Sequence, residues 1–151
     1  MPIKELMDFH GFFFYYYRMT CYDKALSLLA IREHSEAELR NKLIAKGFPK
    51  KEIDEAIKKL LAENFLSDSR FCNLFIRSRL KKNPEGKSIL IMRLRQKGIS
   101  AELAKNSVDS YFEENSDEIN EIFNSYSQKL ITKKGEEKAK LKLYQKGIKL
   151  Y

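Results

Sequence analysis

Hydrophobic residues recur at helical spacing through the chain, and their pattern repeats with a period near fifty residues. A Lys-Gly-apolar motif stands at residues 46–48, 97–99 and 146–148, at spacings of 51 and 49 residues. A leucine or alanine lies eight and four residues before each of the three glycines. A fixed period of this length is typical of a repeated supersecondary unit.

Each repeated glycine predicts the end of a helix. A helix that closes in the left-handed conformation favours glycine just beyond its last turn, followed by an apolar residue that packs back on that turn. All three copies fit, with the pairs Phe48 and Leu43, Ile99 and Leu94, and Ile148 and Leu143. The lysine before each glycine is expected beside terminal carbonyl groups, where a cation is favoured. A ligand-binding role for these lysines is the alternative.

Polar residues mark where the other helices begin. Ser35 and Glu38 form a predicted capping box at the start of a helix of about twelve residues. The next helix is predicted from Pro49 to about Asn64. Further starts are predicted at Ser67, Gly86 and Ser100, and at Asn115 or Ser116. No run of alternating polar and apolar residues in 20–151 predicts a strand.

These elements predict an all-α fold of tandem three-helix repeats in an elongated, curved array, with bends near residues 64–68 and 115–117. A unit of about fifty residues buries little surface alone, and stacking on a neighbour stabilises it. We expect an N-terminal aromatic extension at 1–21 and repeats at 22–65 and 66–115. A truncated third repeat is expected at 116–151, because the chain ends three residues after Ile148.

Six consecutive aromatic residues at 12–17 form an unusual local feature. The run is too short to span a bilayer. A short strand, an apolar flap on the first helical unit and a partner interface are the three interpretations. Base stacking on nucleic acid is less favoured, because no basic residues are interleaved with the aromatic ones.

The formal net charge of +8 is unevenly distributed over the 151 residues. Residues 69–105 hold ten Lys or Arg against two acids, and residues 129–149 hold eight Lys against two acids. Between them, residues 106–128 hold six acids and no Lys or Arg. That acidic block is expected either to pair with the lysines that follow it or to steer towards a basic partner.

The first basic block is the candidate binding surface. Several of its cations recur at helical spacing, so one face of a helix displays them together. Such a surface attracts polyphosphate or an acidic protein. The alternative interpretation is a solvent-exposed helix face with no binding role. The candidate residues are Arg70, Arg77, Arg79, Lys81, Lys82, Lys87, Arg93, Arg95 and Lys97.

The sequence offers little for chemistry. Cys21 and Cys72 are expected to be packing residues, and neither His10 nor His34 has a local metal-binding partner. Glycine-rich phosphate loops and paired catalytic acids are also missing. We therefore predict no enzyme activity, catalytic residue, cofactor or metal. No signal or membrane-spanning pattern appears, so a cytoplasmic location is expected.

At this point the motifs resemble a known family, the RecX regulatory proteins. Residues 25–32 and the pattern Ser-x-x-Glu-Leu-x-x-Lys-Leu-x-x-Lys-Gly-Phe at 35–48 resemble the first RecX repeat. The segment Leu-Ser-Asp-Ser-Arg-Phe at 66–71, Arg77, and Gly-x-x-Ile-x-x-x-x-Leu-x-x-Lys-Gly-Ile at 86–99 resemble the second. The resemblance covers roughly residues 22–148.

The resemblance implies a bacterial modulator of the RecA recombinase, acting in recombination, DNA repair and the SOS response. Such proteins lie in the groove of the RecA filament on single-stranded DNA and inhibit filament growth, strand exchange and ATP hydrolysis. The implied partners are the RecA filament and single-stranded DNA, with double-stranded DNA as a further candidate, bound by a monomer. The short third repeat and the aromatic extension depart from the family pattern.

Two other functions stay open. The first is a general nucleic-acid-binding helical module with no RecA role. The second is a protein adaptor that uses the acidic block and the aromatic segment.

Overall fold

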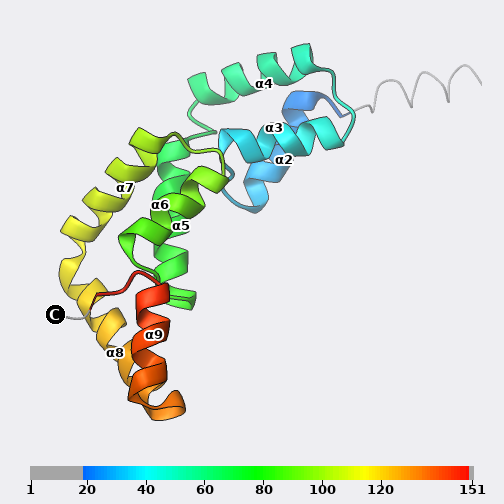
Figure 1. The fold of residues 1–151 in the computed structure, drawn as a ribbon. Helices are drawn as coiled ribbons and strands as arrows, with labels where there is room; N and C mark the ends of the chain where they lie inside the picture. The colour runs from blue at the N-terminus through cyan, green and yellow to red at the C-terminus, as the bar shows by residue number, and fades with distance from the viewer. Residues whose placement is uncertain (1–18, 150–151) are drawn as a thin grey trace, which may run out of the picture.

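The computed structural model describes residues 19–149, which form eight α-helices in a curved row (Figure 1). The helices are α2 (Cys21–Ile31), α3 (Glu36–Ala45), α4 (Lys50–Ala62), α5 (Asp68–Lys82), α6 (Lys87–Gln96), α7 (Ala101–Glu114), α8 (Ser116–Lys134) and α9 (Glu136–Gln145). No strand occurs among these residues. The predicted all-α fold of tandem helical repeats is therefore confirmed.

Helices α3, α6 and α9 end in left-handed glycines, as predicted. Gly47, Gly98 and Gly147 have φ values of 85°, 84° and 67°. In each case the next amide donates to the carbonyl of the leucine five residues earlier, at 3.3, 3.1 and 3.0 Å. Asn64, with φ of 59°, closes α4 in the same way, an ending that the glycine pattern did not reveal.

Serine side chains begin α3, α5 and α7. Ser35, Ser67 and Ser100 each accept a hydrogen bond from the amide three residues later, at 3.1, 3.3 and 3.2 Å. The capping box predicted at Ser35 forms only in part, because the Glu38 carboxylate accepts bonds from other side chains instead. The complete box lies before α2, between Thr20 and Asp23.

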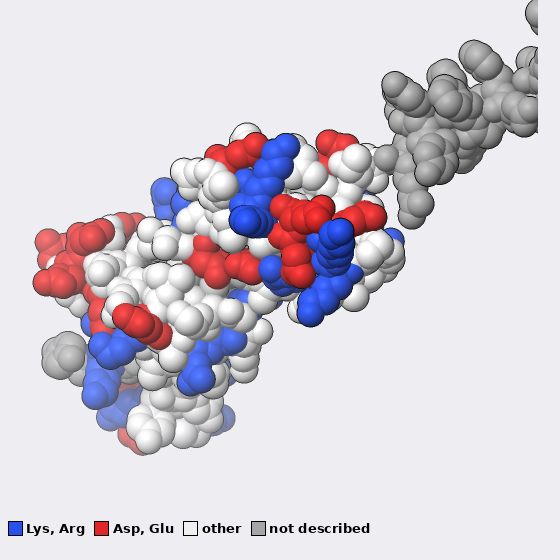
Figure 2. Space-filling view, turned by 90° about the horizontal axis from the view of Figure 1, so that it is seen from above, with Lys and Arg blue, Asp and Glu red and all other residues white. Residues whose placement is uncertain are grey.

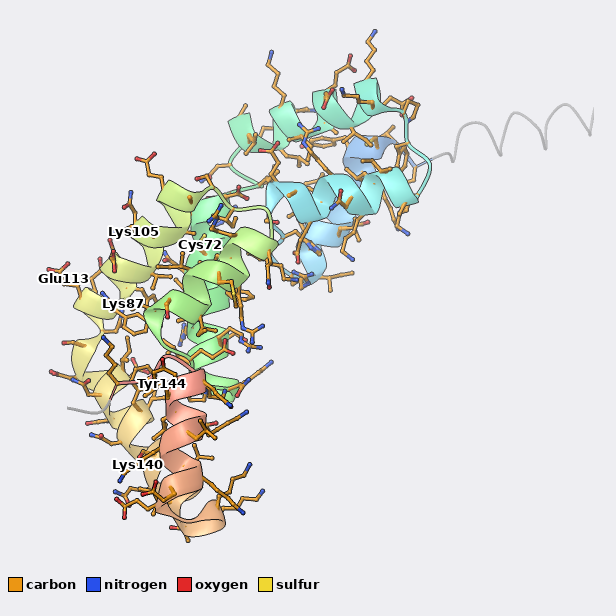
Figure 3. All side chains as sticks on the ribbon, viewed as in Figure 1. Cys72, Lys87, Lys105, Glu113, Lys140 and Tyr144 are labelled. Atoms are coloured by element: carbon orange, nitrogen blue, oxygen red, sulfur yellow. The ribbon has the colours of Figure 1, made fainter. Side chains whose placement is uncertain are left out.

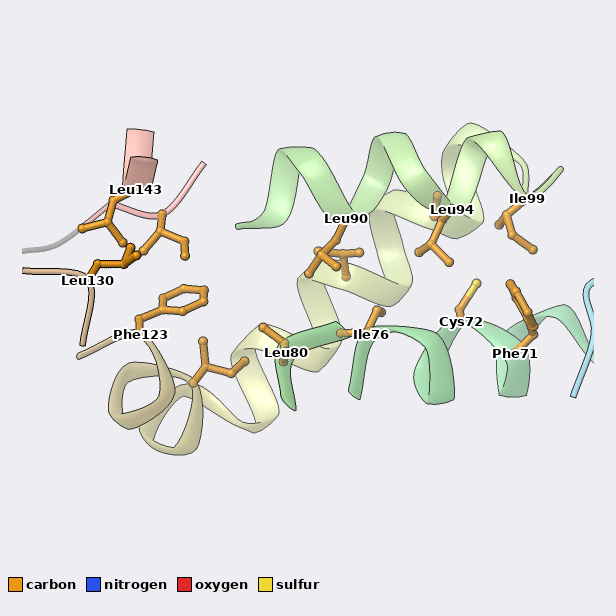
Figure 4. Packing of buried hydrophobic residues seen from close by; sticks show 14 of the residues in the cluster. Phe71, Cys72, Ile76, Leu80, Leu90, Leu94, Ile99, Phe123, Leu130 and Leu143 are labelled. Atoms are coloured by element: carbon orange, nitrogen blue, oxygen red, sulfur yellow. The ribbon is translucent and has the colours of Figure 1, made fainter. Parts of the chain in front are cut away.

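Two hydrophobic cores lie along the row. The first, within α2, α3, α4 and the turn that follows, is built on residues such as Leu39, Leu43 and Ile57. The second runs without a break from α5 to α9 and buries Ile76, Leu90 and other residues (Figure 4). The core therefore continues across the position where the third repeat was expected to begin.

The third unit packs differently from the second. In the second unit α7 packs against both α5 and α6. In the third, α8 and α9 pack directly against each other, and the single residue Gly135 links them. The two helices thus form a tight antiparallel hairpin (Figure 1).

Both cysteines are buried and free, as expected of packing residues. Cys21 belongs to the first core and Cys72 to the second. The aromatic run at 12–17 and nearly all of the expected extension at 1–21 lie outside the described residues. Among residues 19–149, no helix is long and apolar enough to cross a membrane.

The first joint between repeats lies where the last turn of α6 meets the first turn of α3. The Ser35 hydroxyl donates to the carbonyl oxygen of Lys97 at 2.7 Å. A Cβ atom on Gly98 would stand 2.2 Å from the Cβ of Ala37, so Gly98 allows close approach as well as ending its helix. The Asp68 carboxylate accepts from the Glu36 amide at 2.8 Å and caps α3 from the second repeat.

The second joint repeats this arrangement, with α9 placed against the start of α6. The Gly86 amide donates to the carbonyl oxygen of Lys146 at 2.8 Å. The Lys146 side chain is only 9% exposed and donates to Asn83 and, at 3.2 Å, to the carbonyl of Pro84. Lys146 was expected to stay beside exposed carbonyls at the end of α9. That prediction is wrong, because the joint draws its ammonium group inwards.

Candidate nucleic-acid and protein interface

The structure divides the nine candidate cations into two groups. Five form ion pairs with carboxylates of this chain: Arg70, Arg79, Lys87, Arg93 and Lys97. The other four are exposed and have no ion-pair partner within residues 19–149: Arg77, Lys81, Lys82 and Arg95. The second group carries the charge that is available to a partner.

Arg79 and Arg93 clamp a single buried carboxylate, that of Glu85. Each guanidinium donates two hydrogen bonds to it, at distances between 2.7 and 3.1 Å. Burial raises the pKa of Glu85, but the bonds from Arg93 and Arg79 outweigh it and hold the pKa below its ordinary value. The loop between α5 and α6 is thereby fixed to both helices.

Arg70 and Lys97 hold the first two repeats together. Arg70 donates to Glu33 at 2.8 Å, and Lys97 donates to Glu38 at 2.8 Å. Both contacts join the second repeat to the first across the joint beside Ser35. The charges of these two cations are therefore largely compensated within the chain.

Lys87 of α6 and Lys105 of α7, both labelled in Figure 3, share one carboxylate, that of Asp109. The Lys87 ammonium group lies 2.9 Å from one oxygen of Asp109, and that of Lys105 lies 2.8 Å from the other. Hydrogen bonds from Lys105 and Lys87 lower the pKa of Asp109 to about 2. Asp109 thus pairs with cations of the second repeat and not with the third-unit lysines that follow the acidic block.

The available cations of α5 line a groove between α5 and α8 with a volume of about 600 Å³. Arg77, Lys81 and Lys82 form its α5 side. Apolar side chains and two tyrosines lie between the helices: Leu80, Pro84, Ile119, Ile122, Tyr111 and Tyr126. The α8 side carries Glu118, Glu121 and, further along, Lys129.

The acidic block stays exposed where α7 passes into α8. Figure 2 shows acidic side chains gathered at this end of the molecule, with basic side chains in separate patches. Glu118 and Glu121 have no ion-pair partner within residues 19–149. Lys140 pairs instead with Glu136 and Glu137 of its own helix. Of the two expectations for the acidic block, internal pairing with the third-unit lysines is not seen among the described residues.

The charge pattern of the sequence predicted the basic side of the groove but not which residues would lie opposite it. Tyr111, Tyr126 and Lys129 lie 29 residues or more from Lys82, on other helices. Spacing within α7 or α8 does not indicate which neighbouring helix these side chains face. In residues 19–149 no group of three or more potential metal-ligating side chains occurs.

Mild acid is expected to loosen the first joint through His34. This side chain is 3% exposed, and its Nδ1 atom lies 3.4 Å from Glu38. Burial and the Arg32 charge lower its pKa despite Glu38. The unfolded chain therefore binds the proton more tightly than the folded chain, and the free energy of unfolding decreases as the pH is lowered through the ordinary pKa of 6.5.

Urea unfolding between pH 7.5 and 5.5, a range taken around that ordinary pKa, measures this effect. The free energy of unfolding should fall on acidification for the unmodified protein and stay flatter for His34→Gln. His10, which the structure does not place, supplies the matched control as His10→Gln. An equal pH dependence in all three proteins would remove His34 from this role.

The geometry thus defines an all-helical repeat protein whose candidate site is an exposed surface of charges beside an apolar groove. Two family models match it: the first three-helix domain of RecX over residues 21–60 and the second over residues 67–107. Together they cover more than half of the chain. The chain therefore belongs to the RecX family.

Curated relatives agree with this assignment. The chain is 38% identical over 89 residues to the regulatory protein RecX of Prosthecochloris aestuarii, which covers 59% of each protein. It is 43% identical over 79 residues to the RecX protein of Haemophilus influenzae, over 52% of this chain and 51% of the relative. For Bacillus velezensis RecX the identity is 30% over 132 residues, covering 84% and 50%. The chain thus spans about half the length of the curated relatives it matches.

Solved structures support the fold. A crystal structure of regulatory protein RecX has a TM-score of 0.71 at 22% identity, over 85% of this chain and 67% of that one. RecX from Lactobacillus salivarius has a TM-score of 0.69 at 21% identity, over 85% and 86%. At these identities the likeness establishes the arrangement of helices. The family membership and the relatives' names support a regulatory role.

Proposed function

We propose that this protein binds the RecA filament on single-stranded DNA and lowers its ATPase and strand-exchange activities, without catalysing a reaction of its own. The observation that carries the proposal is the match of both three-helix units to RecX domains. The four unpaired cations support it, because a filament exposes phosphate and acidic protein surface. The proposal includes a monomer that acts in recombination, repair and the SOS response, in the cytoplasm.

A RecA-dependent ATPase assay on single-stranded DNA tests this function. Addition of the purified protein should slow ATP hydrolysis, with the effect growing as the protein approaches and exceeds RecA in concentration. An unchanged rate at several-fold molar excess in low salt would overturn the proposal. Equal affinity for naked DNA and for the filament would favour the general nucleic-acid-binding module instead.

The unpaired cations of α5 should dominate the binding. Reversal of Arg77, Lys81 and Lys82 to Glu is expected to weaken filament binding about tenfold or more and to flatten its salt dependence. The matched control reverses Lys50, Lys51 and Lys58, which are exposed on α4 and change the net charge equally. Fluorescence anisotropy over a salt series measures both variants, and equal losses would mean that only net charge matters.

A further inference from the structure

The α5–α8 groove is basic along α5, and along α8 it is acidic at Glu118 and Glu121, with Lys129 as a cation further along that helix. Arg77, Lys81 and Lys82 stand along α5, while Glu118 and Glu121 stand three residues apart on α8. Acidic side chains at this spacing lie on the same face of a helix. At this part of the groove, cations on α5 and carboxylates on α8 therefore line opposite sides.

These cations and carboxylates do not neutralise each other. None of them forms an ion pair with any residue in 19–149. Arg77, Tyr111 and Glu118 all line the groove. Burial raises the pKa of Tyr111, Glu118 raises it further, and Arg77 acts in the opposite direction. The cations of α5 and the two carboxylates of α8 therefore remain available to a partner.

The floor of the groove is apolar. Leu80 and Ile119 are buried there, and Ile122 and Tyr126 are partly buried. Amphipathic helices of partner proteins bind in grooves of this kind, with their apolar face on the floor and charged residues at the rims.

The two carboxylates on α8 argue against nucleic acid as the occupant. A phosphodiester strand lying along the groove would place its phosphates beside Glu118 and Glu121, where like charges repel. A protein helix with acidic residues at one edge and basic residues at the other would satisfy both sets of charges at once. Charge complementarity therefore favours a protein segment over DNA.

We propose that the α5–α8 groove binds an amphipathic helix of the protein component of the filament. The acidic edge of that helix would face α5, and its basic edge would face α8. The inference rests on the proposed function and assigns the filament's protein, not its DNA, to this groove. Arg95 and the remaining exposed lysines are then the cations available to phosphate.

Reversing the charge of the two acids on α8 should change filament binding in opposite directions for a protein helix and for DNA. Glu118→Lys with Glu121→Lys makes the groove uniformly basic. If a protein helix lies there, filament binding should weaken about tenfold, since two ion pairs become repulsive contacts. If DNA lies there, the same change should tighten binding. The matched control is Glu113→Lys with Glu114→Lys, which alters the same acidic block outside the groove.

Anisotropy measurements would use a labelled oligo(dT), first alone and then coated with RecA and a non-hydrolysable ATP analogue. We expect the groove variant to lose affinity for the coated oligonucleotide only, and the control variant to lose none. Tighter filament binding by the groove variant, or equal behaviour of the two variants, would overturn the inference. An unmodified protein that binds no filament would instead overturn the proposed function itself.

Discussion

Replacing Glu85 by leucine is expected to lower the free energy of unfolding by about 3 kcal/mol. Glu85 is 2% exposed and accepts four hydrogen bonds from two guanidinium groups. Without it, Arg79 and Arg93 are left as partly buried charges with no carboxylate between them. Thermal and urea unfolding should both report the loss, with a melting temperature lower by on the order of 10 °C.

The control for this prediction is Glu114→Leu, which removes an exposed acid from α7 and should change stability by less than about 0.5 kcal/mol. A combined replacement of Glu85, Arg79 and Arg93 by leucine should recover much of the loss, because no unpaired charge then remains. Equal stabilities for the two single variants would show that the clamp contributes nothing to folding.

This clamp also changes the interpretation of the basic block. Charge counting placed Arg79 and Arg93 on the same surface as Arg77, because all three lie in a segment rich in cations. The structure ties two of them to an acid that lies six and eight residues away. The net charge of the block therefore overstates the number of cations available to a partner. Arg77, Lys81, Lys82 and Arg95, which have no ion-pair partner within residues 19–149, indicate the binding surface better.

The sequence predicted the helix ends well because their causes are local. Gly47, Gly98 and Gly147 adopt positive φ for a reason that needs only the five preceding residues. Ser67 and Ser100 cap helices through contacts three residues away. Spacing and capping residues were therefore enough to predict where these helices begin and end.

The joints and the groove could not be predicted because their partners lie far apart in sequence. Lys97 meets Glu38 across 59 residues, and Gly86 meets Lys146 across a similar distance. No spacing rule within one helix indicates such contacts. Two of the glycines that end helices also allow close packing between repeats, since Gly98 lies against the start of α3 and Gly147 against the start of α6.

Gly86→Ala tests this close packing and should destabilise the protein by about 3 kcal/mol. Gly86 has φ of −75°, a value that alanine adopts readily, so the cost is one of space alone. The added Cβ would stand 1.8 Å from the carbonyl oxygen of Gly147, a backbone atom that cannot rotate away. The hydrogen bond from the Gly86 amide to Lys146 should break, and α9 should detach from α6.

Gly47→Ala is the matched comparison, because at Gly47 glycine is needed only for the left-handed backbone conformation that ends the helix. Gly47 has φ of 85° but no atom within 4 Å of an added Cβ, so only left-handed strain of about 1–2 kcal/mol is expected. Hydrogen exchange followed by mass spectrometry should show faster exchange in α9 and at residue 86 for Gly86→Ala, and near α3 for Gly47→Ala. Unchanged protection of α9 in Gly86→Ala would mean that the third unit is held by its apolar contacts with α8, and that the close glycine contact is not required for the joint.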